Sequence, residues 1–202
     1  MRLRNDKNAQ YILDSYEYTA KTFPIVLKNT DVVEIGAGKG EMITQLAKLN
    51  PQTTYYAFEK YPTVAAKIVK KAKELQLNNL IIVCKDAKDL SELFTGQCDT
   101  LWLTFSDPWP KVRHEKRRLT YKTFLNQYKD ILTNQGLLKF KSDNDKLFEY
   151  SLESLQNNNW IIINQTNDLH NSEFNQNNIP TGYEIKWSSL GKNINYLEAK
   201  HK

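Results

Sequence analysis

Short apolar runs alternate with amphipathic stretches along most of the chain. The apolar runs predict β-strands at residues 31–35, 53–58, 80–84, 100–105, 137–141, 160–164 and 194–199. Helical spacing of apolar residues predicts helices at 41–49, 62–76, 119–132 and 146–156. Repeated alternation of strand and helix is typical of parallel strands joined through helices. The pattern therefore predicts an α/β protein with a doubly wound sheet.

No internal repeat or linker divides this pattern. A length of 202 residues fits one domain with a full-sized core. We therefore expect a single domain over residues 1–202, with residues 1–28 as an N-terminal segment that packs on it. The polar, Asn-rich stretch 165–191 shows no clear periodicity. A loop of this length is expected to be either functional or mobile.

Composition and charge narrow the class of protein only a little. The net charge of +5 permits a nucleic-acid partner without establishing one. Cys84 and Cys98 form no CxxC pair and lie in apolar surroundings, which favours buried thiols. The first residues lack the apolar core of a signal peptide, and no apolar run of about 18 residues occurs. These features predict a cytoplasmic protein without a membrane span.

A glycine-rich turn lies between the first predicted strand and the first predicted helix. Gly36, Gly38 and Gly40 let the chain turn tightly and let a ligand approach main-chain atoms, although they also suit a plain strand–helix joint. The spacing GxGxG is one residue shorter than the dinucleotide fingerprint. Glu34, just before the turn, would repel a pyrophosphate and suits a ligand with a cationic amino group.

Two further strand ends carry acids. Glu59 follows the second strand, where a carboxylate accepts hydrogen bonds from ribose hydroxyls in nucleotide-binding sheets. Asp86 follows the third strand and can accept from an adenine amino group. Strand-end acids also cap helices, but three in register favour one ligand with an amino group, a ribose diol, an adenine and no phosphate. S-adenosylmethionine fits this description, and NAD fits it poorly.

The segment after the fourth strand combines an acid, an aromatic ring and cations. It reads Thr104-Phe105-Ser106-Asp107-Pro108-Trp109-Pro110-Lys111-Val112-Arg113-His114-Glu115-Lys116-Arg117-Arg118. An indole offers a face on which an extruded base can stack, and the cations suit phosphates. Plainer interpretations exist: Asp107 as a turn former, Trp109 as a core residue, and the cationic run as a solvated helix start.

On these residues the chain resembles the bacterial tRNA (guanine-N7)-methyltransferases. The similarity rests on the glycine turn, the 105–118 segment and the stretches 141–144, 147–151, 168–170 and 181–184, and it extends over nearly the whole chain. It implies the Rossmann-like fold of class I methyltransferases, a seven-stranded mixed sheet with an antiparallel last strand and helices on both faces. It also implies methyl transfer from S-adenosylmethionine to N7 of guanine 46 in the variable loop of tRNA, with S-adenosylhomocysteine as product.

The resemblance further implies roles for individual residues. The implied cofactor-binding residues are Glu34, Gly36, Gly38, Gly40, Glu59, Asp86 and Asp107, of which Asp107 is also the implied catalytic residue. The implied substrate-binding residues are Lys111, Asp143, Thr181, Tyr183 and Glu184. The implied RNA-binding residues are Arg113, His114, Lys116, Arg117 and Arg118. The 165–191 stretch would then be a substrate-side loop, and Gly182 departs from a family that often has glutamate there.

Methyl transfer to guanine N7 needs no general base, because N7 carries an in-plane lone pair and no proton. Positioning and electrostatics are then the tasks of the protein. We expect Asp107 to accept hydrogen bonds from the guanine N1–H and N2 edge and to offset the developing positive charge. His114 and His170 lack metal-ligand spacing, so no metal is expected.

Other functions and properties stay open at this point. The alternatives are a non-catalytic RNA-binding protein, a methyltransferase for exocyclic amines, suggested loosely by Ser106-Asp107-Pro108-Trp109, and a NAD-dependent reductase. The sequence does not decide between a monomer and a homodimer, nor whether Arg2 and Arg4 contact RNA.

Overall fold

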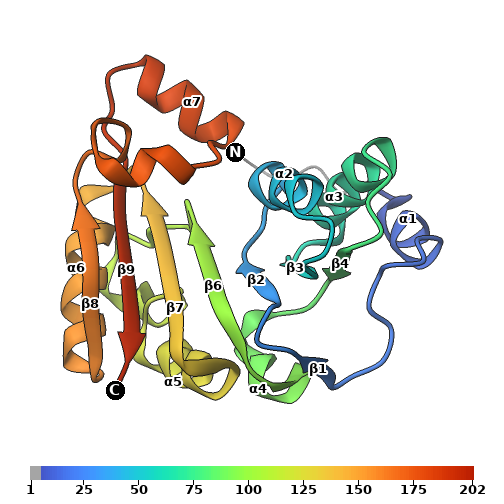
Figure 1. The fold of residues 1–202 in the computed structure, drawn as a ribbon, viewed down its shortest axis with the longest axis horizontal. Helices are drawn as coiled ribbons and strands as arrows, with labels where there is room; N and C mark the ends of the chain where they lie inside the picture. The colour runs from blue at the N-terminus through green and yellow to red at the C-terminus, as the bar shows by residue number, and fades with distance from the viewer. Residues whose placement is uncertain (1–5) are drawn as a thin grey trace.

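The computed structural model describes residues 6–202, and its centre is a seven-stranded sheet (Figure 1). In spatial order the strands are β4 (Leu80–Val83), β3 (Tyr55–Phe58), β2 (Val32–Ile35), β6 (Cys98–Thr104), β7 (Leu132–Ser142), β9 (Asn195–His201) and β8 (Trp160–Thr166). The pairings from β4 to β7 are parallel, and β9 is antiparallel to both of its neighbours. The expected mixed sheet with an antiparallel last strand is confirmed.

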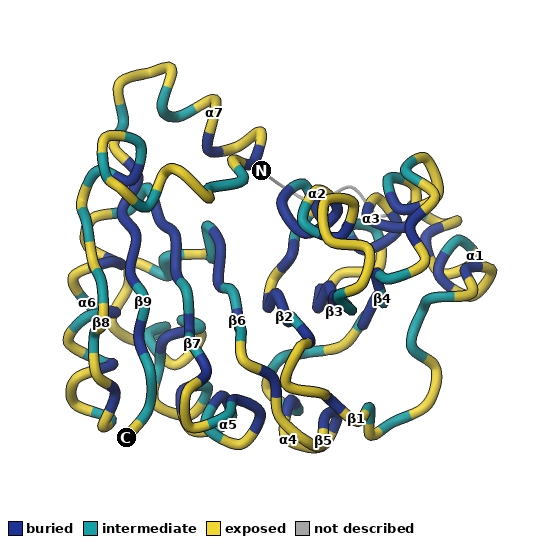
Figure 2. Tube along the Cα trace, in the orientation of Figure 1, coloured by how far each residue is buried: buried dark blue, intermediate teal, exposed yellow. Residues whose placement is uncertain are grey.

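Helices cover both faces of this sheet. One face packs against α1 (Ala9–Asp14), α2 (Glu41–Leu49) and α3 (Pro62–Glu74), and the other against α4 (Leu90–Leu93), α5 (Lys122–Ile131) and α6 (Asp145–Asn157). Along β3, Tyr55 and Ala57 belong to the first core, and Tyr56 and Phe58 to the second. Because successive side chains of a strand point to opposite faces, one apolar strand serves two cores. Figure 2 shows the strands mostly buried and the outer faces of the helices exposed.

The structure contains two short strands that the sequence pattern did not predict. Strands β1 (Ile25–Leu27) and β5 (Phe94–Gly96) form a separate two-stranded parallel sheet. Between α1 and β1, the Tyr16 hydroxyl donates to the Leu77 carbonyl over 3.3 Å, and Leu13 is buried in the α2–α3 core. Residues 6–28 thus lie against the sheet and α3. Arg2 and Arg4 lie outside the described residues.

The Asn-rich stretch contains three short helices rather than a plain loop. They are η3 (Leu169–Asn171), η4 (Glu173–Asn177) and α7 (Gly182–Ser189). A third apolar cluster fixes η3 and η4 on the sheet, with Leu169 and Tyr196 at its centre and Trp102 and Phe174 beside them. From there α7 extends toward α2 beyond the carboxyl end of β7 (Figure 1). Within residues 6–202, no helix is long and apolar enough to cross a membrane.

Candidate functional site

A cavity of about 650 Å³ opens at the carboxyl ends of the central parallel strands. Its lining includes Gly36 after β2, Glu59 after β3, Asp86 after β4 and Asp107 after β6. The carboxyl ends of neighbouring parallel strands meet at one edge of a sheet, where such folds bind their ligands. Four residues that the sequence assigned to a cofactor site therefore share one cavity.

The three glycines of the turn differ in what they do. All have positive φ, 76° at Gly36, 56° at Gly38 and 69° at Gly40, a region that disfavours other residues. Only Gly36 lines the cavity. A Cβ on Gly40 would lie 2.7 Å from Cγ2 of Ile68, so this glycine allows α2 to pack against α3. Gly40 therefore has a packing role in the strand–helix joint, and its place in the cofactor site stays a prediction.

Glu59 is a buried carboxylate that the backbone holds in place. Its Oε2 accepts a 3.0 Å hydrogen bond from the Gly38 N–H, and its Oε1 accepts one of 3.0 Å from the Tyr61 N–H. Burial raises the pKa of Glu59, although these hydrogen bonds oppose the shift. Each carboxylate oxygen keeps a second lone pair. Glu59 can therefore accept hydrogen bonds from a ligand diol while it shapes the glycine turn.

Asp86 caps a short helix and also lines the cavity. It caps the short helix η1 (Ala87–Asp89) by accepting from the Lys88 N–H over 3.2 Å. Its other oxygen forms a 2.7 Å ion pair with Lys60. Burial tends to raise the pKa of Asp86, but the Lys60 ammonium and the Lys88 N–H hold it below the ordinary value. Asp86 is thus an ionised acceptor at the wall of the cavity.

Glu34 lies behind the glycine turn and does not line the cavity. It is 1% exposed; Oε1 accepts from the Thr104 hydroxyl, and Oε2 has no hydrogen-bond partner among residues 6–202. Burial raises the pKa of Glu34 to about 7, although Thr104 and the Lys141 ammonium act in the opposite direction. A buried carboxylate oxygen without a partner is unfavourable. A cationic amino group is the kind of ligand that would satisfy it.

Asp107 lies in a turn whose backbone is under strain. Phe105 and Trp109 have φ values of 49° and 42°, which are uncommon for residues with bulky side chains. The Phe105 N–H donates to the Lys141 carbonyl over 2.9 Å, which fixes the start of the turn. Asp107 itself is exposed and makes no side-chain hydrogen bond or ion pair within residues 6–202. Its carboxylate is therefore available to a ligand.

Trp109 lines the cavity instead of filling the core. The Arg117 guanidinium lies over its ring, 4.8 Å from the centroid. The His114 ring approaches edge-on at 5.9 Å. Both partners come from the helix η2 (Val112–Arg117). One face of the Trp109 indole is therefore covered by a guanidinium, a group that can itself stack on a nucleic-acid base.

The cationic run divides into outward and inward side chains. Lys111, Arg113 and Lys116 are exposed and make no side-chain hydrogen bond or ion pair in the described part of the chain. Lys116 and Arg117 reach the lining of the cavity. Arg118 points inward and donates to main-chain carbonyls. Lys111 and Arg113 thus present positive charge at the surface, and Lys116 brings positive charge to the cavity that Asp107 also lines.

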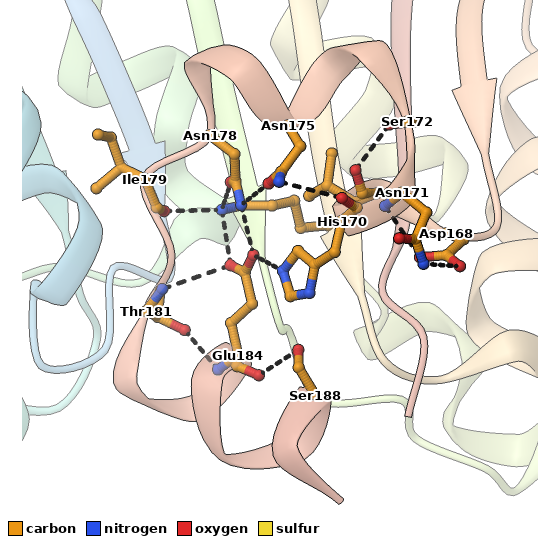
Figure 3. A network of polar contacts seen from close by, with 12 residues as sticks. Asp168, His170, Asn171, Ser172, Asn175, Asn178, Ile179, Thr181, Glu184 and Ser188 are labelled. Carbon is orange, nitrogen blue, oxygen red and sulfur yellow. Dashed lines mark hydrogen bonds and ion pairs between the residues drawn. The ribbon is translucent and has the colours of Figure 1, made fainter. Parts of the chain in front are cut away.

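A buried polar network, shown in Figure 3, ties α7 to β7. Lys141, 1% exposed, donates to Glu184 over 2.9 Å, to the Asn178 side chain over 2.9 Å and to the Ile179 carbonyl over 3.0 Å. Glu184, 0% exposed, also accepts from Asn178 over 2.7 Å and contacts His170 Nε2 at 2.8 Å. Thr181 and Glu184 form a capping box at the start of α7. The sequence-based interpretation did not single out Lys141.

The remaining predicted substrate residues lie beside the cavity and not in its lining. The Tyr183 hydroxyl donates to Asp143 over 3.2 Å, and its ring lies 5.2 Å from that of Phe105, a lining residue. The Gly182 N–H donates to Glu41 over 2.6 Å. A Cβ on Gly182 would lie 2.9 Å from the same Glu41 oxygen, so a larger residue here would displace the Glu41 side chain. Helix α7 is thus attached to α2 and to the end of β7.

Residues 6–202 contain no cluster of side chains suited to hold a metal ion. No group of three or more His, Cys, Asp or Glu side chains is arranged to hold an ion there. Cys98 is buried, and Cys84 is only partly so. The site in the described chain is therefore built from carboxylates, main-chain groups, aromatic rings and cations.

The sequence of this chain is similar to those of known methyltransferases. Residues 28–197 match a family model described as "Putative methyltransferase". The tRNA (guanine-N(7)-)-methyltransferase of Mycoplasmopsis agalactiae is 57% identical over 202 residues, 99% of this chain and 98% of that protein. The protein of the same name from Mycoplasmopsis pulmonis is 52% identical and covers 100% of both chains.

Solved structures resemble this fold at much lower identity. The 16S rRNA methyltransferase KamB aligns with a TM-score of 0.63 and 13% identity, covering 100% of this chain and 95% of its own. TrmN from Thermus thermophilus aligns with a TM-score of 0.60 and 15% identity, covering 96% of this chain and 48% of its own. At such identities the likeness concerns the fold alone, which is that of class I methyltransferases.

Proposed function

Because the chain belongs to the family of tRNA (guanine-N7)-methyltransferases, we propose that it methylates N7 of guanine 46 in the variable loop of tRNA. The methyl donor we propose is S-adenosylmethionine, and the place of action the cytoplasm. The observation that carries the proposal is the cavity that Gly36, Glu59, Asp86 and Asp107 line together, with Asp107 unpaired within residues 6–202. Family membership sets aside a non-catalytic RNA-binding protein and a NAD-dependent reductase.

The residues around the cavity fit the proposed donor group by group. Glu59 would accept hydrogen bonds from the ribose hydroxyls, and Asp86 from the adenine amino group. Glu34, buried behind the glycine turn, has a carboxylate oxygen without a hydrogen-bond partner among residues 6–202, and a cationic amino group that reached this oxygen would pair with it. The open Gly36 lets the ligand approach the main chain. When bound, S-adenosylmethionine supplies a methyl group that its positive sulfur makes electrophilic.

Asp107 is the residue that we propose to act on the guanine. Its carboxylate would accept hydrogen bonds from the N1–H and N2 groups and so aim N7 at the methyl group. Formation of the bond between N7 and the methyl carbon, with cleavage of the methyl–sulfur bond, would leave positive charge on the purine, and a fixed carboxylate would stabilise that charge. The N7 atom carries no proton, so the transfer requires no general base. Fixing this carboxylate before the base arrives would add to the rate, because a positioned group needs no reorganisation at the moment of reaction.

The exposed cations next to the cavity support the proposed tRNA contact. Lys111, Arg113 and Lys116 make no side-chain hydrogen bond or ion pair in the described chain, so they can meet phosphates without losing a partner. Phosphate contacts of this kind give affinity that falls with salt. Trp109 and Arg117 together would form the platform for an extruded guanine.

The test is a methylation assay followed by nucleoside analysis. Unmodified tRNA is incubated with the protein and methyl-labelled S-adenosylmethionine, and the product is digested and analysed by mass spectrometry. We expect 7-methylguanosine from the wild-type tRNA and none from a tRNA in which adenine replaces guanine 46. Methyl groups on N2 or N6 would refute the N7 assignment, and label in the adenine-46 tRNA would refute the position.

A further inference from the structure

Arg118 differs in its contacts from the other cations of its run. Its Nε donates to the Pro108 carbonyl over 3.1 Å, and its Nη2 donates to the Trp109 carbonyl over 3.1 Å. Its guanidinium lies over the Tyr150 ring, 4.2 Å from the centroid. Arg113, in contrast, is exposed and makes no side-chain hydrogen bond or ion pair within residues 6–202. Arg118 therefore donates its hydrogen bonds to main-chain groups of the protein.

The carbonyls that Arg118 holds belong to the turn that carries Asp107. Within the described chain, residues 105–110 are tied by the Phe105 N–H at one end and by the two Arg118 hydrogen bonds at the other. Asp107 lies between these two attachments and has no hydrogen bond or ion pair of its own there. With positive φ at Phe105 and Trp109, the turn needs outside support to keep its shape.

We propose that Arg118 is a positioning residue, which acts through the Pro108 and Trp109 carbonyls to hold Asp107 at the cavity. This inference rests on the proposed function, because it assigns Asp107 its role at the guanine. A guanidinium suits the task because it is planar, offers parallel donors along one edge and stacks on an aromatic ring. The ammonium of lysine keeps the charge but has neither property. A contact with RNA phosphate would instead tolerate lysine.

The experiment compares conservative substitutions at two arginines of the same run. Arg118→Lys and Arg113→Lys are measured for kcat at saturating tRNA and S-adenosylmethionine, and for tRNA affinity at several salt concentrations. We expect Arg118→Lys to lower kcat roughly 10- to 100-fold, as displaced catalytic groups do, with an unchanged salt slope. Arg113→Lys keeps the charge and should leave the salt slope unchanged, and Arg113→Ala should lower that slope by about one.

A second measurement needs no tRNA. Because Asp107 and Trp109 line the donor cavity, Arg118→Lys should also weaken S-adenosylhomocysteine binding by up to about tenfold, the scale of one lost hydrogen bond. A wild-type protein that labels no tRNA would refute the proposed function and leave this titration as the test of Arg118. Wild-type kcat and product affinity in Arg118→Lys would overturn the proposal. So would an Arg118→Ala variant whose only defect is a lower salt slope.

Discussion

The buried pair of Lys141 and Glu184 gives a quantitative prediction about stability. Both side chains are almost fully buried, at 1% and 0% exposure, and they meet at 2.9 Å. Replacing Lys141 by methionine keeps the bulk of the side chain and leaves the Glu184 charge without its cation. Replacing Glu184 by glutamine removes the other charge and keeps a side chain that can complete the capping box. The two changes and their combination form a double-mutant cycle.

The expected size follows from the burial of the pair. Removing one partner of a buried ion pair costs about 3–5 kcal/mol, because the remaining charge stays desolvated. The unfolding entropy is about 2.1 cal/mol/K per residue, so for 202 residues this loss lowers Tm by about 7–12 °C. The double variant contains no unpaired charge. It should therefore be less destabilised than the two single variants added together, with a coupling of roughly 1–3 kcal/mol.

The assay is thermal and urea unfolding of the four proteins, followed by circular dichroism, between pH 2 and pH 8. Burial tends to raise the pKa of Glu184, but the Lys141 ammonium and the hydrogen bonds from Asn178 and His170 hold it below the ordinary value. A lowered folded pKa contributes stability above the unfolded pKa of about 4.3, and that stability is lost as the pH falls through the folded pKa. Lys141→Met should shift this acid limb to higher pH. A single-variant cost below about 1 kcal/mol, or strictly additive losses, would refute the argument.

Three further predictions concern Asp107 in the cavity, Glu34 behind the glycine turn, and Gly40 within that turn. Asp107→Ala should lower kcat by roughly 10²-fold or more at unchanged Tm, since Asp107 is exposed and unpaired in the described chain; wild-type turnover would contradict its role. The pKa of Glu34 is raised from 4.5 to about 7, so its ionisation costs stability as the pH rises through that window. Glu34→Gln should therefore gain roughly 3 kcal/mol relative to wild type above pH 7 while weakening S-adenosylhomocysteine binding, as checked by urea unfolding and calorimetry. Gly40→Ala should lower the free energy of unfolding by roughly 1–3 kcal/mol more than Gly191→Ala, because both glycines have positive φ but only Gly40 would place a Cβ against Ile68.

The strands and long helices were predictable from the sequence because each carries its own apolar pattern. The helix predicted at 41–49 is confirmed as α2, and the strand predicted at 31–35 as β2 within one residue. Strands β1 and β5 were missed because each has three residues, too few to show a period. Helix α7 was missed since its apolar residues Tyr183, Ile185 and Trp187 alternate with other residues and form no stripe at helical spacing. The Thr181-x-x-Glu184 spacing of its capping box was nevertheless visible in the sequence.

The candidate site was predictable where it follows strand ends and less so where it depends on packing. Acids after β3, β4 and β6 share a cavity because parallel strands end at one edge. The inward direction of Arg118 could not be predicted, because a run of cations does not indicate which side chain donates hydrogen bonds to main-chain carbonyls and which faces solvent. Lys141 was overlooked although it continues an alternation in which Leu138 and Phe140 enter one core. A lysine on the opposite face of a central strand needs a buried anion.

The charge of Lys141 acts on two buried acids, Glu184 in α7 and Glu34 behind the glycine turn. On one side it pairs with Glu184 and so attaches α7 to the end of β7. On the other side its charge lowers the pKa of Glu34, the buried acid behind the glycine turn. An uncharged residue at this position would loosen α7 and also favour the protonated form of Glu34, which cannot attract a cationic amino group. Loss of donor affinity in Lys141→Met should therefore be largest near pH 7 and become smaller at higher pH, where Glu34 ionises without help.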